Sequence, residues 1–553
     1  MSWANEMFRR MSLEEKVGHV IICRGLEYTD SMERMLQEGR LGGVGGVTIR
    51  QVCNQEPEKI LDYINQILSI SKIPPFLFFD CEKGITDMFP IGTPFPDSMA
   101  VGATHDPDMA YRLGKAIAEE ARMIGFTLIC NPVLDVNSNP DNPIIGTRSF
   151  GDRVDFVTDF GAEYIKGVQE VNVIPTGKHF PGHGDTSVDS HVSLPVVYHD
   201  RKHLDEVELK PFRELVEKGM KGIMTAHIYY PALQAGDEEG TPATLSSKVL
   251  IDMLKKEWKF EGLVVSDSLT MRAVKDRYGT EKAAVMAFKA GNDLLLQDYE
   301  TDPEITFNAL LDAVKEGEIS MNELDTAVLK ILKMKEWCGV DKISRILPDV
   351  HQKLNHQTEH IALSREIAQK SVTLFEKKSL PINPNSKTLL LAVRSDALLK
   401  AARDMGTAIP KKSGYLYASV QRYQPDADLQ TVEEDPTPEE IDHIMEKVKQ
   451  YETILFVSFV RILSYKKGSG KMPESQIRLV QMLHRTGKDV STVIVGNPYV
   501  IRELPDTGNM ICTYSDCMYA IDAAVDVLYG GAKAAGKLPV TINEKYSFGY
   551  GLA

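Results

Sequence analysis

The segment Gly262-Leu263-Val264-Val265-Ser266-Asp267 is a short apolar run, typical of a buried strand, that ends in a carboxylate. Seven further runs of this kind lie between residues 17 and 335, and amphipathic stretches of helical length separate most of them. They are Val17–Cys23, Leu41–Ile49, Pro75–Asp80, Thr127–Val136, Ile174–Phe180, Gly222–His227 and Asn292–Gln297. Strands that alternate with helices predict a parallel sheet, and eight such units predict an α/β fold of the (β/α)8 TIM-barrel type.

The second half of the chain repeats this alternation after a break rich in Gly, Pro, Asn and Gln between residues 337 and 360. A helix is expected from Glu359 to Phe375. The later strand candidates are Thr388–Val393, Tyr415–Val420, Thr453–Phe459, Thr492–Val495 and Met510–Tyr514, and the later helical patterns are Thr437–Gln450 and Glu474–Arg485. The pattern predicts a catalytic barrel over 1–336, a linker with a connecting helix over 337–375, and a doubly wound α/β sandwich domain over 376–553. The last domain lacks GxGxxG and P-loop motifs, which indicates a supporting role.

Composition narrows the class of protein. The 553 residues are 43% hydrophobic and 25% charged, with a formal net charge of −15. This balance argues against nucleic-acid or anionic-membrane partners, because both need basic surfaces. The seven cysteines are an odd number without a CxxC pair, which favours a reducing compartment. Neither a signal peptide nor an apolar run of membrane-spanning length is recognisable, so a cytoplasmic protein is expected.

Polar residues stand at the ends of several predicted strands. Asp80 ends the third run, Lys178 and His179 end the fifth, His227 ends the sixth, and Asp267 ends the seventh. Catalytic groups of such barrels come from the carboxyl ends of several strands, so these side chains are candidates for one site. Taken alone, each of them is also a reasonable cap for the helix that follows.

The loop that follows the fifth strand carries the most chemistry. Lys178–His191 reads KHFPGHGDTSVDSH and holds three histidines and two aspartates around a Pro-Gly turn. These are metal-ligand types, and a metal-assisted hydrolase is one reading, although no HxH or HExxH pair is present. Hydrogen-bonded loop residues without chemistry are another. In an extended segment, Asp189 and His191 point the same way, so the carboxylate can hold the imidazole as an acid/base group. We therefore expect no metal and no cofactor.

The motif resembles the KHFPGHGDTxxDSH signature of the bacterial β-N-acetylglucosaminidases in glycoside hydrolase family 3. The segments Asn131–Val136, Ile145–Gly151, Met224–His227, Pro242–Ser246 and Gly262–Thr270 also resemble family segments in the same order. The resemblance implies a retaining exo-enzyme that releases GlcNAc from β-linked glycosides derived from peptidoglycan or chitin. It implies Asp267 as nucleophile, His191 as general acid/base and Asp189 as its partner. It further implies that Asp80, Arg148, Lys178 and His179 bind the sugar.

The chain departs from the family pattern after the third strand. Where the family usually shows Asp-x-Glu-Gly-Gly-x-Val-x-Arg, this sequence has Lys83 at a glycine position and Met88 at the arginine position. The first change removes a residue suited to positive φ and the second removes a bidentate donor, so sugar contacts are expected to differ. A β-glucosidase, a phosphorylase, a metal-dependent hydrolase and a non-catalytic sugar-binding protein remain alternative interpretations.

Overall fold

The computed structural model describes residues 2–25, 28–52, 56–299, 301–394, 412–462, 469–506 and 508–553. Its contacts divide the chain into two compact units. The first unit comprises Met1–Thr93, Ala110–Asn142 and Val154–Gln357. The second comprises Pro94–Met109, Pro143–Arg153 and Thr358–Ala553. None of the helices within these described ranges is long and apolar enough to cross a membrane.

The first unit is built on a closed ring of parallel strands. Its strands are β1 (Ile21–Gly25), β2 (Gly43–Gly45), β3 (Phe76–Phe79), β4 (Leu128–Ile129), β5 (Ile174–Pro175), β6 (Gly177–Phe180), β7 (Gly222–Thr225), β8 (Leu263–Val265) and β9 (Leu295–Tyr299). One sheet runs in the order β5-β4-β3-β2-β1-β9 and another in the order β6-β7-β8. Parallel bridges from Val133 to Lys178 and from Val265 to Leu294 join the two sheets. With β5 and β6 as halves of one strand, this is the predicted eight-stranded barrel.

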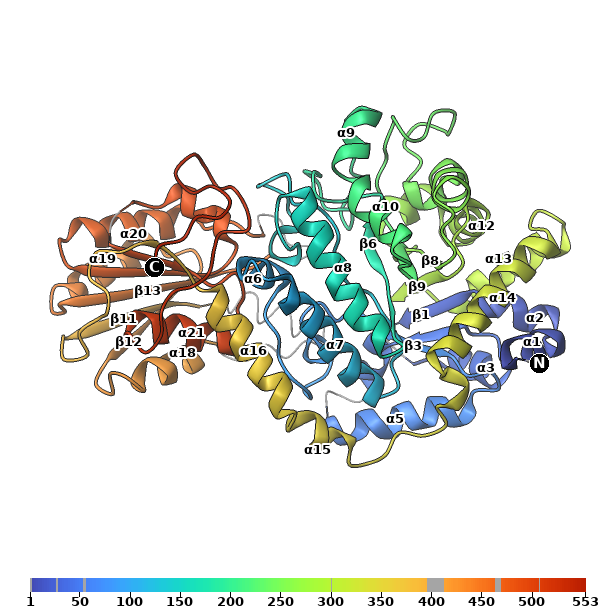
Figure 1. Cartoon of the computed structure of the whole chain (residues 1–553), viewed down its shortest axis with the longest axis horizontal. Helices are drawn as coiled ribbons and strands as arrows, with labels where there is room; N and C mark the ends of the chain where they lie inside the picture. The colour runs from blue at the N-terminus through green and yellow to red at the C-terminus, as the bar shows by residue number, and fades with distance from the viewer. Residues whose placement is uncertain are drawn as a thin grey trace. The chain divides into compact units, whose positions relative to one another are not determined.

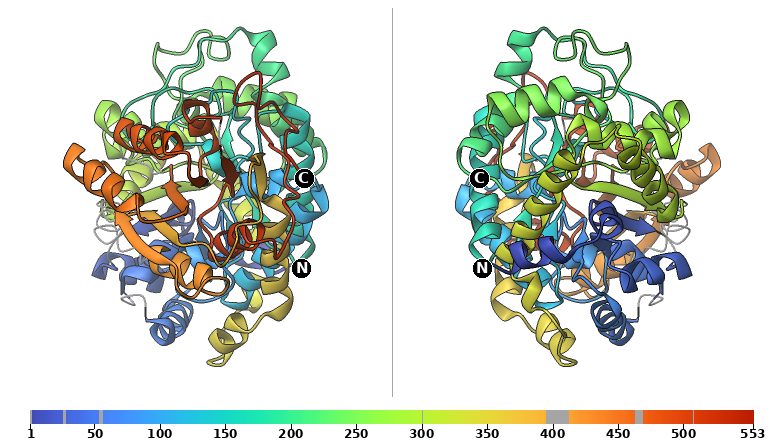
Figure 2. Two further views of the ribbon diagram at one scale, coloured as in Figure 1. Left: turned by 90° about the vertical axis from the view of Figure 1, so that its left-hand side faces the viewer. Right: turned by 90° about the vertical axis from the view of Figure 1, so that its right-hand side faces the viewer.

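Helices lie outside these strands, as Figure 1 and the right-hand view of Figure 2 show. They are α1 (Trp3–Arg10), α2 (Leu13–His19), α3 (Asp30–Gln37), α4 (Gly46–Val52), α5 (Pro57–Ile70), α7 (Pro107–Met123, apart from its first turn), α8 (Val154–Glu170), α9 (Arg201–Glu206), α10 (Leu209–Glu217), the π-helix η4 (Lys248–Glu257), α11 (Arg272–Tyr278), α12 (Thr280–Ala290), α13 (Pro303–Lys315), α14 (Met321–Cys338) and α15 (Val350–Asn355). The short 3-10 turns are η1 (Ile85–Asp87), η3 (Ala243–Leu245) and η5 (Val340–Lys342).

Three expected boundaries in this unit are wrong. Val17 belongs to α2 rather than to the first strand, because Ser12 and Glu15 form a capping box that starts a helix there. The run Leu41–Ile49 holds only a three-residue strand, and its end forms α4, in which the β-branched Val47 and Ile49 are buried. Burial there overrides the low helix propensity of those residues. The amphipathic stretch His203–Lys218, one of those of helical length between the expected strands, predicts a single helix but holds two, α9 and α10.

The second unit is a doubly wound sheet, as predicted. Its strands are β10 (Thr373–Glu376), β11 (Thr388–Val393), β12 (Asp428–Val432), β13 (Thr453–Val460), β14 (Asp489–Gly496) and β15 (Asn509–Cys512), in the order β10-β15-β14-β13-β11-β12. All neighbours are parallel except β10 and β15. Its helices are α6 (Ser98–Ala103), α16 (Thr358–Ser371), α18 (Lys412–Gln421), α19 (Pro438–Val448), α20 (Glu474–Arg485) and α21 (Met518–Leu528), with 3-10 turns η2 (Gly146–Arg148) and η6 (Pro498–Glu503).

Alternate residues of the strands build two separate cores in this unit. Leu389 and Leu391 of β11 pack with side chains of α19 and α20, whereas Leu390 and Ala392 pack with side chains of α18 and α21. Figure 1 shows these helix pairs on the two faces of the sheet.

Two predictions for the second unit are wrong. The segment Tyr415–Val420 is helical, because Leu416 and Val420 lie one turn apart and enter the same core. The connecting helix ends at Ser371, and β10 follows it.

Candidate active site

The polar residues singled out at strand ends all lie at the carboxyl ends of barrel strands. Asp80 directly follows β3, Lys178 and His179 lie within β6, and His227 and Asp267 each lie two positions after the last residue of β7 and β8. All five belong to the first unit. The parallel closed sheet therefore brings together residues that are almost 190 positions apart in the sequence, at the end of the barrel where active sites form.

A buried lysine links two carboxylates at this end. Lys178 Nζ lies 3.0 Å from Asp80 Oδ1 and 2.8 Å from Glu82 Oε1, and Asp80 also pairs with Arg24 of β1. Burial alone would raise the pKa of Asp80, but Lys178 and Arg24 outweigh it and lower that pKa below its ordinary value. Asp80 is therefore a carboxylate that is held rigidly, and the group offers both acceptors and a charged donor to a bound polyol.

Asp135 organises the backbone at the end of β6. Its Oδ1 accepts hydrogen bonds from the amides of His179, at 3.1 Å, and His183, at 2.7 Å, while its Oδ2 lies 2.7 Å from His179 Nδ1. Burial would raise the pKa of Asp135, and the two imidazoles and these amides lower it. An ionised carboxylate only accepts, so Nδ1 of His179 carries the proton and its tautomer is fixed.

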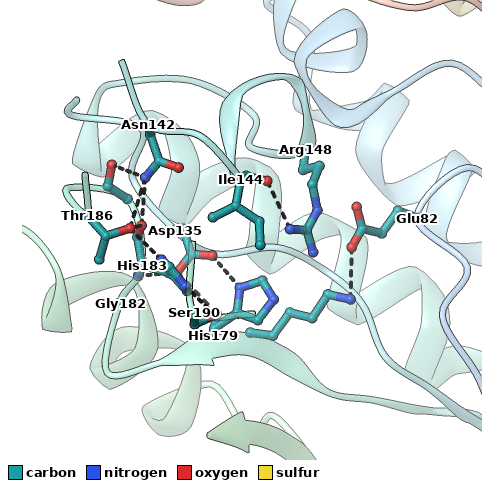
Figure 3. A network of polar contacts seen from close by, with 12 residues as sticks. Glu82, Asp135, Asn142, Ile144, Arg148, His179, Gly182, His183, Thr186 and Ser190 are labelled. Carbon is teal, nitrogen blue, oxygen red and sulfur yellow. Dashed lines mark hydrogen bonds and ion pairs between the residues drawn. The ribbon is translucent and has the colours of Figure 1, made fainter. Parts of the chain in front are cut away.

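The turn after β6 is held by hydrogen bonds of its own (Figure 3). His183 is buried, with Nδ1 2.6 Å from Thr186 Oγ1 and Nε2 3.2 Å from Ser190 Oγ. Asn142 donates to the carbonyls of His183, at 2.8 Å, and Gly184, at 2.9 Å. Gly184 lies so close to the Val136 carbonyl that a Cβ there would be 1.6 Å from its oxygen. Only glycine fits this position, and His183 is a structural residue of the loop.

The dyad expected at the end of this loop is formed. His191 Nδ1 lies 2.7 Å from Asp189 Oδ1, and the same oxygen accepts the backbone N–H of His191 at 2.9 Å. Both side chains are largely but not completely buried. Since the carboxylate accepts from Nδ1, Nε2 is the nitrogen of His191 that can take up and release a proton. The Nδ1 atoms of the three histidines of the loop thus bond to three different side chains, those of Asp135, Thr186 and Asp189.

Asp267 is the negative centre of the site. It is partly exposed, and its Oδ1 accepts the amide of Ser268 at 2.7 Å. Burial would raise the pKa of this carboxyl, but three imidazoles and that amide lower it well below its ordinary value. The imidazoles belong to His227, His179 and His191. Asp267 is therefore ionised at neutral pH, and His191 is close enough to act on it electrostatically.

His227 positions the chain that follows the carboxylate. Its Nε2 lies 2.7 Å from the carbonyl of Ser268 and its Nδ1 lies 2.9 Å from Thr244 Oγ1. Burial lowers the pKa of His227, whereas the Asp267 carboxylate and the Ser268 carbonyl raise it, and Nε2 donates to that carbonyl. The contact fixes the peptide next to Asp267.

Arg148 is the one predicted site residue that lies in the second unit. It ends η2, and its Nη1 donates to the carbonyl of Ile144 at 3.0 Å, as Figure 3 shows. Its sugar-binding role stays a prediction.

The departure from the family pattern after β3 does not force an unusual backbone conformation on Lys83. The adjacent Gly84 has φ +90°, and Lys83 is not among the described residues with positive φ, so Lys83 needs no glycine. Met88 is buried, with its Cγ close to Gly46, where the related sequences place an arginine.

Several residues of the site were not predicted from the sequence. Arg24, Glu82 and Asp135 make its ion pairs, and His183 and Asn142 shape its loop. Glu82 lies two positions after Asp80, and His183 bonds within its own loop, so their places could have been read from the sequence. Arg24, Asp135 and Asn142 bond to residues more than 40 positions away, and nothing near them in the sequence reveals these partners.

Comparison with known proteins agrees with this arrangement. Residues 12–334 match the model of the glycosyl hydrolase family 3 N terminal domain. A β-hexosaminidase A from Pseudoalteromonas piscicida is 28% identical over 90% of this chain and 89% of its own length. The structure of a family 3 β-N-acetylglucosaminidase from Paenibacillus sp. str. FPU-7 is 31% identical, covers 96% of this chain and 99% of its own, and has a TM-score of 0.83. A β-glucoside phosphorylase, BglX, shares the fold at 22% identity and a TM-score of 0.82, covering 98% of this chain and 95% of its own.

The match to this family and the similarity to these relatives show that the protein is a glycoside hydrolase. The chain belongs to glycosyl hydrolase family 3.

Proposed function

We propose that the enzyme is a retaining exo-β-N-acetylglucosaminidase that removes GlcNAc from the non-reducing ends of glycosides derived from peptidoglycan or chitin. The observation that carries this proposal is the pairing of His191 with Asp189 beside the ionised Asp267. The names of the relatives, β-hexosaminidase and β-N-acetylglucosaminidase, support the choice of sugar.

In the proposed first step the Asp267 carboxylate attacks the anomeric carbon and forms an ester bond to the sugar. The glycosidic C–O bond breaks, and protonated His191 gives its Nε2 proton to the departing oxygen. Asp189 stabilises the imidazolium before this transfer and keeps Nδ1 protonated throughout. Because both the attack and the later displacement invert the anomeric centre, the product retains its configuration.

In the second step neutral His191 takes a proton from water, whose oxygen attacks the anomeric carbon. The ester bond to Asp267 breaks, the carboxylate is regenerated, and His191 is again protonated. Asp80 and Lys178, held at the end of β3 and β6, bind sugar hydroxyls in this proposal, together with His179. Lys178 sits between two carboxylates and is thereby kept charged for that role.

Phosphorolysis is the second candidate function. It is favoured by a histidine, rather than a carboxylic acid, as the proposed acid/base group. A carboxylate acid/base repels an incoming phosphate after it has lost its proton, whereas a neutral imidazole does not. Phosphate could then attack the glycosyl-enzyme in place of water and yield a sugar 1-phosphate.

One experiment separates these functions. Aryl β-GlcNAc and aryl β-glucoside are compared as substrates, with and without inorganic phosphate, and the sugar products are resolved by chromatography. We expect faster turnover of the GlcNAc substrate and free GlcNAc as product. Release of GlcNAc 1-phosphate as main product would replace hydrolysis with phosphorolysis, and a preference for the glucoside would overturn the choice of sugar.

We also propose that the enzyme works in a reducing compartment such as the cytoplasm. The six cysteines of the described residues are all free and buried, while Cys53 lies outside those residues.

A further inference from the structure

A second cluster of titratable side chains lies beyond the catalytic loop and takes no part in the proposed chemistry. His199 and His203 flank the start of α9, and Glu208 lies between α9 and α10. One potential ligand atom from each of these three residues lies within 4.8 Å of the other two. Asp185, from the loop itself, has Oδ2 2.5 Å from His199 Nε2. Two imidazoles and two carboxylates therefore meet at one place.

Glu208 is the member of this cluster that most requires a partner. Its side chain is 4% exposed, and neither carboxylate oxygen accepts a hydrogen bond. The nearest charged contact runs from Oε1 to His203 Nε2 at 3.7 Å, which is too long for a hydrogen bond. Buried carboxylates are almost always bonded, so an unbonded one that faces two imidazoles calls for a specific explanation.

The two imidazoles are arranged side by side. The rings of His199 and His203 stack with centroids 3.9 Å apart and planes 25° from parallel. This arrangement brings one ring nitrogen of each histidine to the same side as the Glu208 carboxylate, within 4.8 Å of one another. The Asp185 carboxylate can orient His199 or join the coordination directly, as carboxylates beside metal-bound histidines do.

We propose that Asp185, His199, His203 and Glu208 form a structural Zn²⁺ site. Two imidazole nitrogens with two carboxylates form a four-member donor set of the kind that zinc accepts. The imidazoles argue against Mg²⁺ and Ca²⁺, which prefer all-oxygen surroundings. The metal site weighed from the sequence lay within the loop Lys178–His191, and Asp185 is the residue common to both sets. His199 and His203 form an i, i+4 pair beyond that loop.

Such an ion would tie the catalytic loop to the helices behind it. Asp185 precedes Asp189 by four residues and His191 by six. A Cβ on Gly182 would lie 2.7 Å from that of Glu208, and Tyr230 donates from its hydroxyl to the Gly182 carbonyl. The loop is therefore already packed against the cluster at its start. Zinc would add a bond there without touching the substrate, so the site does not depend on the proposed function.

The test is direct metal binding by the whole chain. The protein is stripped with EDTA and titrated with Zn²⁺ by calorimetry, with the bound metal counted by elemental analysis. We expect one Zn²⁺ per chain with a Kd tighter than about 10 µM. Replacement of Zn²⁺ by Co²⁺ should give the intense visible absorption of a tetrahedral site, which reports ligand geometry independently of activity.

Variants identify the ligands. The double variant His199→Ala/His203→Ala should lose this zinc ion, and Glu208→Gln should weaken binding at least about tenfold. Both histidines are partly exposed, so their truncation leaves the packed core intact. The matched control, His351→Ala/His356→Ala, removes two near-surface histidines close to α15 and should keep the full stoichiometry. Absence of a bound equivalent in the native chain, or full binding by the His199/His203 variant, would overturn the proposal.

Discussion

His191 and Asp189 are bonded twice through a single oxygen, since Oδ1 of the aspartate accepts both Nδ1 and the backbone N–H of the histidine. The proposed acid/base imidazole is thus held by a residue two positions earlier in the same loop. The imidazole of His191 and the carboxylate of Asp189 that holds it therefore lie in one loop. Each can be tested by a substitution there.

Removal of the His191 imidazole should slow the cleavage of substrates with poor leaving groups more than that of substrates with good ones. We expect His191→Ala to lower kcat/KM by about 10²-fold or more for aryl glycosides whose phenols are poor leaving groups, and far less for dinitrophenyl glycosides. Asp189→Asn should show the same dependence, because the tautomer of His191 is no longer fixed. Rates across a series of aryl leaving groups measure this slope. Ser187→Ala, an exposed change in the same loop, is the control, and an equal loss for all leaving groups would contradict the assignment.

Asp267 should carry the covalent intermediate. Asp267→Ala is expected to lower kcat by at least about 10³-fold, because no other carboxylate replaces it. In the His191→Ala variant with a dinitrophenyl substrate, release of the sugar becomes the slow step, so the glycosyl-enzyme should accumulate. Mass spectrometry of peptides would locate one sugar on the peptide that contains Asp267. A label on another carboxylate, or wild-type rates for Asp267→Ala, would refute the nucleophile assignment.

The strand before the nucleophile depends on a buried ion pair whose pH dependence can be predicted. Asp293 lies 2.9 Å from Lys255 Nζ and 3.1 Å from Lys330 Nζ, and accepts the amide of Val264 in β8. Burial would raise the pKa of Asp293, but the two lysines and this amide lower it. A lowered pKa in the folded state means stabilisation that is complete above the unfolded value, about 4, and that disappears as the pH falls through the folded value.

We therefore expect Asp293→Asn to destabilise the barrel by about 2–3 kcal/mol at pH 7, since the lysines lose their partner but are partly exposed. The difference from wild type should stay constant between pH 6 and 8 and shrink below about pH 4. Urea unfolding at pH 7 and pH 3.5 measures it. Asp252→Asn, which breaks a surface pair with Lys256, should change little. A difference that grows at low pH would disprove this account.

The glycine in the loop turn should be irreplaceable. Gly184→Ala places a Cβ against the Val136 carbonyl, so the turn must shift and carry His191 with it. We expect a fall in kcat of about 10²-fold, since a displacement of 1 Å is enough for such a loss, while most of the stability remains. Gly414→Ala is the control, because a Cβ on Gly414 of α18 meets no atom within 4 Å. Steady-state kinetics of both variants measure the change in kcat, and thermal unfolding measures the change in stability.

The architecture could be predicted because each barrel strand is a short apolar run bounded by helical patterns. The wrong predictions concern segments whose secondary structure is set by packing in the core rather than by local propensity. Val47 and Ile49 are β-branched yet helical, and Leu416 and Val420 alternate like strand residues yet lie one helical turn apart in a core. In both segments the local propensity favours a strand and the surrounding core favours a helix.

The contacts of the site likewise divide into those that the sequence predicts and those that it does not. The dyad could be predicted because its two members are only two positions apart, but the extended segment expected there is wrong: Asp189–Val192 forms a turn in which the Val192 amide donates to the Asp189 carbonyl. The Asp135 contacts with His179 and His183 could not, since the partners are more than 40 residues apart and meet only when β6 lies beside the chain that follows β4. The His199–Glu208 cluster was missed because its members are separated by a helix cap and a short helix.

The hydrogen bonds from Asn142 and within the loop hold the turn that precedes His191, and this support is separate from β8, which ends shortly before Asp267. With the roles proposed above, substitutions in the loop would alter the choice of aglycone and acceptor while the barrel keeps the proposed nucleophile in place. The segment 181–191 is therefore the part of the chain to vary first in a search for transglycosylating variants.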